Sequence, residues 1–308
     1  MKRALAAWAC AAAACAGFAR ADAWRAPREG LDQRMQRAGI SVYYTGQGDN
    51  AFPADRVAPL LDQMAVAQRY YEQQLGLQPP LRMPRYQGQL RGIDVHVMRM
   101  PDSNGSAGDA AVRYRYRRFG DAPGRVLTIT VSTRWSPPNL TPSHELFHTY
   151  QYGYTLFKNR WFLEGMARAM EHPIEGDAGP SAPLPASRGG WNAVVGRSYG
   201  AEAFWTRLMQ VCEPACTPVR AALARPCGGV LVRSTLEAFQ QMDQRASADR
   251  GLDPHDWPED EQHSAANVPY MARGILNAVD RACHKPWPAE LAAFTGMLEQ
   301  VAVPRKGP

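Results

Sequence analysis

The sequence predicts an α+β fold, in which a small mixed sheet comes before a set of helices. Segments with the two-residue period of a strand dominate the chain up to about residue 135, with one helical segment among them. After the prolines at 137–138, the periodic segments have the spacing of helices, and no internal repeat is present. We therefore expect an α+β subdomain over residues 24–175 and an all-helical subdomain over residues 176–308, with a cleft between them.

The first subdomain should contain one long helix between its strands. Apolar residues recur at helical spacing from about Pro53 to Leu75, and Gly76 and the Pro79-Pro80 pair then end the helix. The strands are expected where β-branched and aromatic residues alternate with others. The predicted strands are residues 40–46, 93–100, 111–119 and 126–135, and residues 24–38 form a loose lead-in.

The segment AVRYRYRRF alternates between two kinds of side chain. Val112, Tyr114 and Tyr116 share one face, and arginines share the other. A turn rich in glycine, serine and aspartate precedes it at 102–109. The sequence DAPG at 121–124 would join it to the next strand as a hairpin.

The rest of the chain should be helical, because apolar residues recur there every three or four positions. The first of these helices lies at the junction of the two subdomains, and we expect the small sheet and its helix to pack against it. The predicted helices are residues 142–154, 161–171, 200–211, 217–225, 233–247 and 266–282.

The N-terminus has the layout of a secretory signal peptide over residues 1–23. A basic start precedes an apolar run, and small-x-small cleavage sites end at Ala21 and Ala23. The run is short for a membrane span. A lipoprotein attached at Cys15 is the weaker alternative, because Ala12 stands where leucine is usual. We therefore expect a secreted or periplasmic protein without a membrane span.

The charge of the chain argues against a nucleic-acid partner. The composition is that of an ordinary globular protein, and the formal net charge is +6 over 308 residues. Removal of residues 1–23 would leave a net charge of +4. This mild excess is spread along the chain, whereas nucleic-acid binding proteins gather basic residues on one face.

Four cysteines lie beyond the predicted signal peptide. An even number in an exported chain predicts two disulfides, for which three pairings are possible. The alternative is a second zinc site that uses the close spacing of Cys212 and Cys216, which an oxidising compartment disfavours. The four residues are Cys212, Cys216, Cys227 and Cys283.

The segment HELFHTYQ, residues 144–151, carries the clearest chemical signal. On a helix, His144 and His148 lie one turn apart on the same face, so that both imidazoles can reach one metal ion. Glu145 lies beside that face and can act on a water molecule without binding the ion. H-E-x-x-H on a helix is the signature of a zinc hydrolase, with the glutamate as general base.

Catalytic zinc takes a third protein ligand and leaves one position open. A histidine six residues after the motif is one known choice, but Tyr154 occupies that position. The segment WFLEGMARAME at 161–171 supplies Glu164 instead. Fifteen residues separate Glu164 from His148, enough for the first helix to end and for a second to return beside it. We therefore expect His144, His148 and Glu164 to hold Zn²⁺.

H-E-L-F-H followed by W-F-L-E-G-M-A resembles the gluzincin metallopeptidases, and most closely bacterial peptidase domains of the MA-like sort. The motifs cover residues 144–167, and the order of the preceding elements extends the likeness to about 40–170. The resemblance implies a thermolysin-like fold and a peptide or protein substrate. It implies His144, His148 and Glu164 as zinc ligands and Glu145 as general base. The G-x-M-E-N segment of the aminopeptidases is missing, which leaves endopeptidase and exopeptidase activity both open.

The resemblance also implies roles for residues around the ion. Arg168 stands where thermolysin-like enzymes carry an aspartate that supports a zinc histidine, and Glu171 is an alternative support. A second oxyanion donor is commonly a tyrosine or histidine. Tyr199 is the first candidate for this catalytic role and Tyr270 the second, although Tyr199 is equally compatible with a core position at the start of a helix.

Peptide substrates of such enzymes pair with a strand that lies roughly 25–30 residues before the histidine motif. Residues 111–119 fall there by count. Their arginines either face the substrate or form an exposed basic face that protects the sheet edge, and the second interpretation is favoured. The remaining histidines of the helical part have no spacing partner and are expected to be structural or on the surface. They are His172, His255, His263 and His284.

The leading hypothesis is therefore an exported zinc metallopeptidase. The alternative is a non-catalytic exported protein, either a zinc-binding module or a binding protein derived from a peptidase. The intact Glu145 favours the enzyme, because a structural zinc site needs no base and has a closed fourth position.

Overall fold

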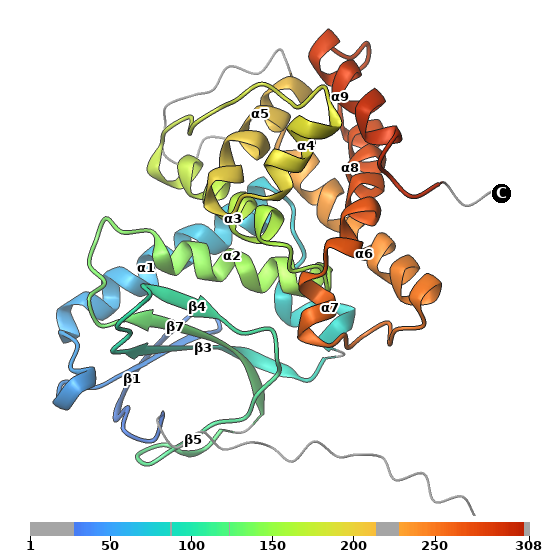
Figure 1. The fold of residues 1–308 in the computed structure, drawn as a ribbon. Coiled ribbons are helices and arrows are strands. Elements are labelled where there is room, and N and C mark those ends of the chain that lie inside the picture. The colour runs from blue at the N-terminus through green and yellow to red at the C-terminus, as the bar shows by residue number, and fades with distance from the viewer. Residues whose placement is uncertain (1–27, 87, 123, 214–227, 305–308) are drawn as a thin grey trace, which may run out of the picture.

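The computed structural model describes residues 28–304, except for residues 87, 123 and 214–227. It confirms the predicted α+β class, with a small mixed sheet and several helices. Helices cover one face of the sheet and extend beyond it into a second helical layer (Figure 1). The predicted signal peptide and the predicted helix at 217–225 lie outside the described residues.

The sheet has five strands in the order β1-β2-β3-β7-β4. The central strands β2, β3 and β7 are parallel, with Val42, Val95 and Ile129 side by side, and both edge strands are antiparallel to their neighbours. The three central strands confirm the strands predicted around residues 40–46, 93–100 and 126–135. The bounds are β1 Gln33–Arg37, β2 Ile40–Tyr44, β3 Leu90–Met98, β4 Gly105–Ala107 and β7 Arg125–Ser132.

Both edges of the sheet differ from the sequence prediction. The polar lead-in contains β1, and the turn predicted at 102–109 contains β4. Polar side chains at these positions are compatible with strands because an edge strand is only half covered. The prediction of a loose lead-in was therefore wrong at residues 33–37, and the prediction of a turn was wrong at residues 105–107.

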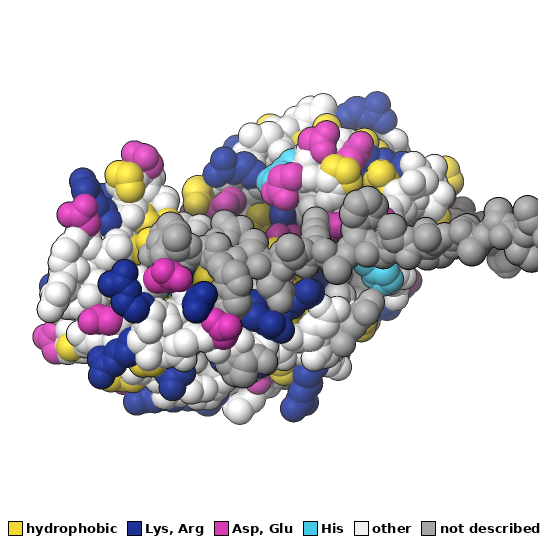
Figure 2. Space-filling model, turned by 90° about the horizontal axis from the view of Figure 1, so that it is seen from below, with side chains coloured by type: hydrophobic (Ala, Val, Ile, Leu, Met, Phe, Trp, Pro, Cys, Tyr) yellow, Lys and Arg dark blue, Asp and Glu magenta, His cyan; other side chains and the backbone are white. Residues whose placement is uncertain are grey.

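Residues 111–119 pair with the sheet only at Val112, which bridges to Val126 of β7, and then cover the other face of the sheet. Within them only β5, Arg115–Tyr116, is a strand, and it pairs with the two-residue strand β6, Gly120–Asp121. Tyr116 is buried and its ring stacks on Tyr43 with centroids 3.9 Å apart. The tyrosines alternate with arginines because the tyrosines pack against the sheet. On that side of the molecule, basic and acidic side chains are interspersed on the surface (Figure 2).

Helices account for most of the remaining structure. Three helices, at 188–195, 259–263 and 289–299, were not predicted. None of the helices in the described part of the chain is both long and apolar enough to cross a bilayer. The bounds are α1 Val57–Arg69, α2 Thr141–Tyr154, α3 Arg160–Glu175, α4 Arg188–Val195, α5 Glu202–Cys212, α6 Gly229–Arg250, α7 Glu259–His263, α8 Val268–Ala282 and α9 Ala289–Glu299.

Helix α2 is the centre of the molecule. Every residue from Pro142 to Tyr154 is buried, because α2 is covered by the sheet, by α1 and by the helical layer (Figure 1). Helix α1 continues as a π-helical turn at Tyr70–Gln74, from which the Tyr71 hydroxyl donates to the Ser143 carbonyl at 3.0 Å. A helix enclosed in this way is held rigidly, which suits it to carry functional side chains.

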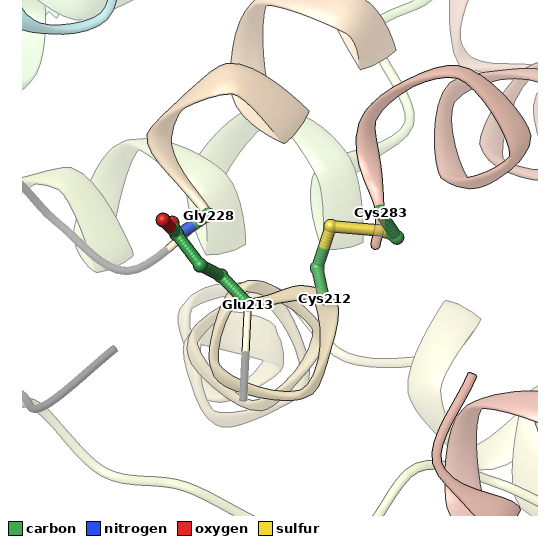
Figure 3. The surroundings of a disulfide bond; sticks show 4 residues. All are labelled: Cys212, Glu213, Gly228 and Cys283. Carbon is green, nitrogen blue, oxygen red and sulfur yellow. A yellow bond between two sulfur atoms is a disulfide. The ribbon is translucent and has the colours of Figure 1, made fainter. Parts of the chain in front are cut away.

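A disulfide joins Cys212 at the end of α5 to Cys283 after α8 (Figure 3). Among the three possible pairings it leaves only Cys216 with Cys227, which both lie outside the described residues. A zinc site that uses Cys212 is ruled out, since its sulfur is in the disulfide. The Gly228 amide donates to the Glu213 carboxylate at 2.8 Å, which brings together the residues on either side of the undescribed segment.

The turn between α2 and α3 is supported by the distant helix α6. Asp243 on α6 is buried, and its carboxylate accepts a hydrogen bond from the Leu156 amide at 2.8 Å. Burial raises the pKa of Asp243 to about 7, while hydrogen bonds from the turn partly counteract this increase. The protonation state of Asp243, which supports the turn between α2 and α3, therefore changes near neutral pH.

The stability of the protein should reflect this raised pKa. A carboxyl group with a higher pKa in the folded state favours folding when protonated, so its contribution is lost as pH rises from about 4 through about 7. Asp243→Asn keeps an acceptor for Leu156 but does not titrate. We expect its free energy of unfolding to exceed that of the wild type at pH 8, by roughly 1–3 kcal/mol.

Urea unfolding between pH 4 and pH 8 measures this difference. The matched control is Asp102→Asn, which changes an exposed aspartate and should follow the wild-type curve. Parallel curves for Asp243→Asn and the wild type would contradict the assigned role of the buried carboxyl group.

Candidate metal centre

The N-terminal part of α2 places two histidines side by side. The Thr141 amide donates to the Asn139 side chain at 2.9 Å, and the His144 amide donates to the Leu140 carbonyl, so the helix begins just before the motif. The rings of His144 and His148 lie perpendicular, with centroids 4.6 Å apart. Both are buried, and their i, i+4 spacing turns them to the same side of the helix.

Helix α3 returns beside α2 and brings Glu164 to the two imidazoles, as the sequence predicts. Its Oε2 atom lies 3.2 Å from Nε2 of His144 and 3.6 Å from Nε2 of His148. One donor atom from each of the three residues lies within 4.8 Å of the others, so this group could hold a metal ion. We call His144, His148 and Glu164 the metal centre.

Outer hydrogen bonds fix which nitrogen of each imidazole faces Glu164. Nδ1 of His144 lies 2.7 Å from the Glu171 carboxylate, and Nδ1 of His148 lies 2.8 Å from Oε1 of Gln151. The orientation of the Gln151 amide follows from its other end, which donates to two carbonyls of α3. Since each Nδ1 donates outward, each Nε2 faces the centre and is the nitrogen that can bind an ion.

These distances fit a zinc-sized ion. Zinc binds nitrogen and oxygen at about 2.0–2.2 Å, which places the ligand atoms of a tetrahedral site roughly 3.4 Å apart. The two distances from Glu164 to the imidazoles bracket that value. The donor set of two imidazoles and one carboxylate is also one that catalytic zinc uses.

Glu145 lies beside the metal centre and outside its group of donors. Its side chain is buried against the edge strand β4, because a Cβ atom on Gly105 would come within 2.7 Å of Oε1 of Glu145. Only a glycine lets the strand pass this close. The outer edge of the sheet therefore runs directly past the carboxylate that the sequence singles out as general base.

The charges of the site influence one another strongly. Burial raises the pKa of Glu145, which the two histidines partly offset. Burial alone would lower the pKa of His144, but its contacts with Glu164 and Glu171 raise it to about 9. For Glu164, the two histidines overcome the effect of burial and hold the pKa well below its ordinary value. A metal ion at Nε2 competes with a proton for the same lone pair.

Of the two tyrosine candidates, the structure brings only Tyr199 to the centre. Its ring lies 5.8 Å from that of His144, and half of the residue is exposed. Burial and the Glu164 carboxylate raise the pKa of Tyr199 to about 12, so the hydroxyl keeps its proton near neutral pH. Tyr270 instead lies against Asp249, and no described contact joins it to the two histidines.

Two residues around the metal centre, Arg168 and Gln151, differ from the sequence prediction. Arg168 does not replace the missing aspartate as a partner of a histidine, but forms an ion pair with Glu171, which contacts His144. Gln151 was not predicted, although its place three residues after His148 puts it within reach of that side chain. His172, expected to be structural or on the surface, is buried, and it forms a second group of possible metal donors with Glu175 and Asp177.

The chain was compared with known proteins at the level of family, sequence and structure. No family model, no curated protein and no solved structure matches it. The likeness to gluzincin peptidases thus depends on the two motifs at 144–148 and 161–167 and on the local arrangement of their side chains.

Proposed function

We propose that the protein is an exported zinc-dependent peptidase of gluzincin type. The observation that carries this proposal is the convergence of His144, His148 and Glu164 on one point, with Glu145 next to them but outside the donor group. Such an arrangement separates the residues that hold the ion from the residue that moves a proton. The disulfide and the signal-like N-terminus support export.

Zinc in such a site polarises a carbonyl group and lowers the pKa of water. The protein supplies the remaining chemistry. Glu145 accepts a proton from the attacking water and returns it to the nitrogen of the leaving amine. Its buried position raises its pKa, which suits a group that must both take up and release a proton. Tyr199, protonated at neutral pH, donates to the developing oxyanion.

The edge strand β4 is the proposed binding site for the peptide substrate. β4 pairs with β7 on one side, and no described strand pairs with its other side. A peptide can add to that edge as a further strand, held by backbone hydrogen bonds that do not depend on its side chains. The close approach of Gly105 to Glu145 would then place the scissile bond near the general base.

A mixed peptide library with mass-spectrometric readout tests the proposal. The zinc-loaded protein should cleave a subset of the peptides, a chelator should stop cleavage, and added zinc should restore it. Cuts within peptides would identify an endopeptidase, and removal of terminal residues would identify an exopeptidase. A zinc-loaded protein that cleaves nothing in the library would favour the alternative of a non-catalytic zinc-binding module.

A further inference from the structure

A second cluster of metal-binding side chains lies where α3 ends. His172 is in the last turns of the helix, Glu175 is its final residue, and Asp177 follows the left-handed Gly176. One donor atom from each of these three side chains lies within 4.8 Å of the others. We call His172, Glu175 and Asp177 the outer cluster.

The outer cluster contains a buried nitrogen that lacks a hydrogen bond. His172 is 8% exposed, and its Nδ1 atom has no hydrogen-bond partner. Oδ1 of Asp177 lies 2.7 Å from it, but outside hydrogen-bond geometry, and accepts from the Gly179 amide instead. Buried polar atoms almost always have a partner, so this nitrogen calls for a ligand.

The surroundings favour a cation as that ligand. A Cβ atom on Gly179 would come within 2.5 Å of the imidazole, so the chain folds closely over one side of His172. The carboxylates of Glu175 and Asp177 remain about half exposed, which leaves access from solvent. The carbonyl end of a helix also carries partial negative charge.

We propose that His172, Glu175 and Asp177 form a second binding site, for a divalent transition-metal ion. One imidazole nitrogen with two carboxylate oxygens suits zinc, cobalt or manganese better than calcium or magnesium, which prefer oxygen alone. Two of the three ligands are exposed, so water completes the coordination. His172, expected from the sequence to be structural or on the surface, would then be a metal ligand.

A line of polar contacts connects the outer cluster to the metal centre. Nε2 of His172 lies 3.2 Å from the Glu202 carboxylate, which also contacts Nε of Arg168 at 3.4 Å. Arg168 pairs with Glu171, and Glu171 contacts Nδ1 of His144. An ion on Nδ1 of His172 leaves the proton on Nε2 and so fixes the first contact of this line. This connecting role depends on the proposed function, whereas the outer site itself does not.

Zinc titration of the metal-free full-length protein by calorimetry tests the outer site. The wild type should bind two ions, and His148→Gln with Glu164→Gln should leave one. Glu175→Gln with Asp177→Asn should lower the zinc affinity of the outer cluster by more than roughly 100-fold. Loss of a residue that only supports a ligand already costs roughly 10–100-fold in affinity. Asn at 177 can still accept from Gly179, so the turn should persist.

Two controls make the result decisive. His263→Gln changes an exposed histidine that contacts a single carboxylate, Glu259, and should bind zinc like the wild type. Circular dichroism should show that all variants fold alike. In nitrogen NMR of labelled histidine, zinc should shift Nδ1 of His172 in the variant that lacks the metal centre.

The proposal is overturned if the Glu175→Gln and Asp177→Asn variant binds as many ions as the wild type, or if zinc leaves Nδ1 of His172 unshifted. Failure of the metal centre gives a different result. The wild type would then bind one ion, which only the outer variant loses. The two proposals can therefore fail separately.

Discussion

Glu145→Gln is expected to retain the ion of the metal centre and to lose nearly all peptide cleavage. Glutamine has the size and shape of glutamate but cannot accept the proton of the attacking water. Loss of a general base typically lowers the rate by roughly 10²–10⁴-fold. Since Glu145 lies outside the donor group, metal content and folding should not change. The measurement is kcat with a peptide found in the library, together with zinc per chain.

The matched control for this variant is Glu237→Gln on α6. Glu237 is partly exposed and pairs with Arg233 four residues earlier, so its loss should leave kcat unchanged. Equal cleavage by Glu145→Gln and the wild type would show that the activity comes from another site. Loss of zinc from Glu145→Gln would instead show that this carboxylate helps to hold the ion.

Glu164→Ala is expected to lose the ion of the metal centre. In the wild type, Oε2 of Glu164 faces Nε2 of both histidines. Removal of this carboxylate leaves the metal centre with two imidazoles. We expect zinc affinity at the centre to fall by more than roughly 100-fold. Cleavage of the library peptide should disappear with it. Calorimetric titration of the metal-free protein measures the affinity.

Glu171→Gln provides a graded comparison. Glu171 contacts His144 at Nδ1, away from the nitrogen that faces Glu164, so this variant should weaken zinc binding by about 10–100-fold without removing a ligand. A Glu164→Ala protein that kept full affinity would refute the third ligand. A larger loss from Glu171→Gln than from Glu164→Ala would reverse the assigned order of the two carboxylates.

The sequence predicts the metal centre well because the centre is local. Helical spacing alone places His144 and His148 on one face, and one turn returns the chain to Glu164. Glu171 was anticipated from the same helix. Gln151 could have been found by counting three residues on from His148, since side chains at that spacing meet on a helix.

The surroundings of the centre depend on long-range packing and were harder to predict. β4 consists of three small residues, Gly105–Ala107, so it shows no alternation of apolar and polar side chains, and only its pairing with β7 makes it a strand. In residues 111–119 the alternation was real, but it reflects tyrosines that pack beneath the sheet. The three unpredicted helices, α4, α7 and α9, are short and interrupted by glycine or flanked by proline.

His172 illustrates a different limit. Its partner Asp177 follows Gly176, whose positive φ of 81° reverses the chain after the helix. A helical wheel does not extend through such a residue, so the pairing of positions 172 and 177 is not visible as a period. The ends of helices can therefore assemble ligands that periodic patterns miss.

The contacts that shape the metal centre also bear on the order in which the protein folds. They are close along the chain: His148 and Gln151 are 3 positions apart, His144 and Glu164 are 20 positions apart, and His144 and Glu171 are 27 positions apart. Asp243, which supports the turn from outside, is 87 residues from Leu156. Short loops cost less entropy to close, and topologies rich in local contacts form faster. The α2–α3 pair can therefore assemble its donors before α6 arrives, and zinc captured at that stage would contribute its binding energy to folding itself.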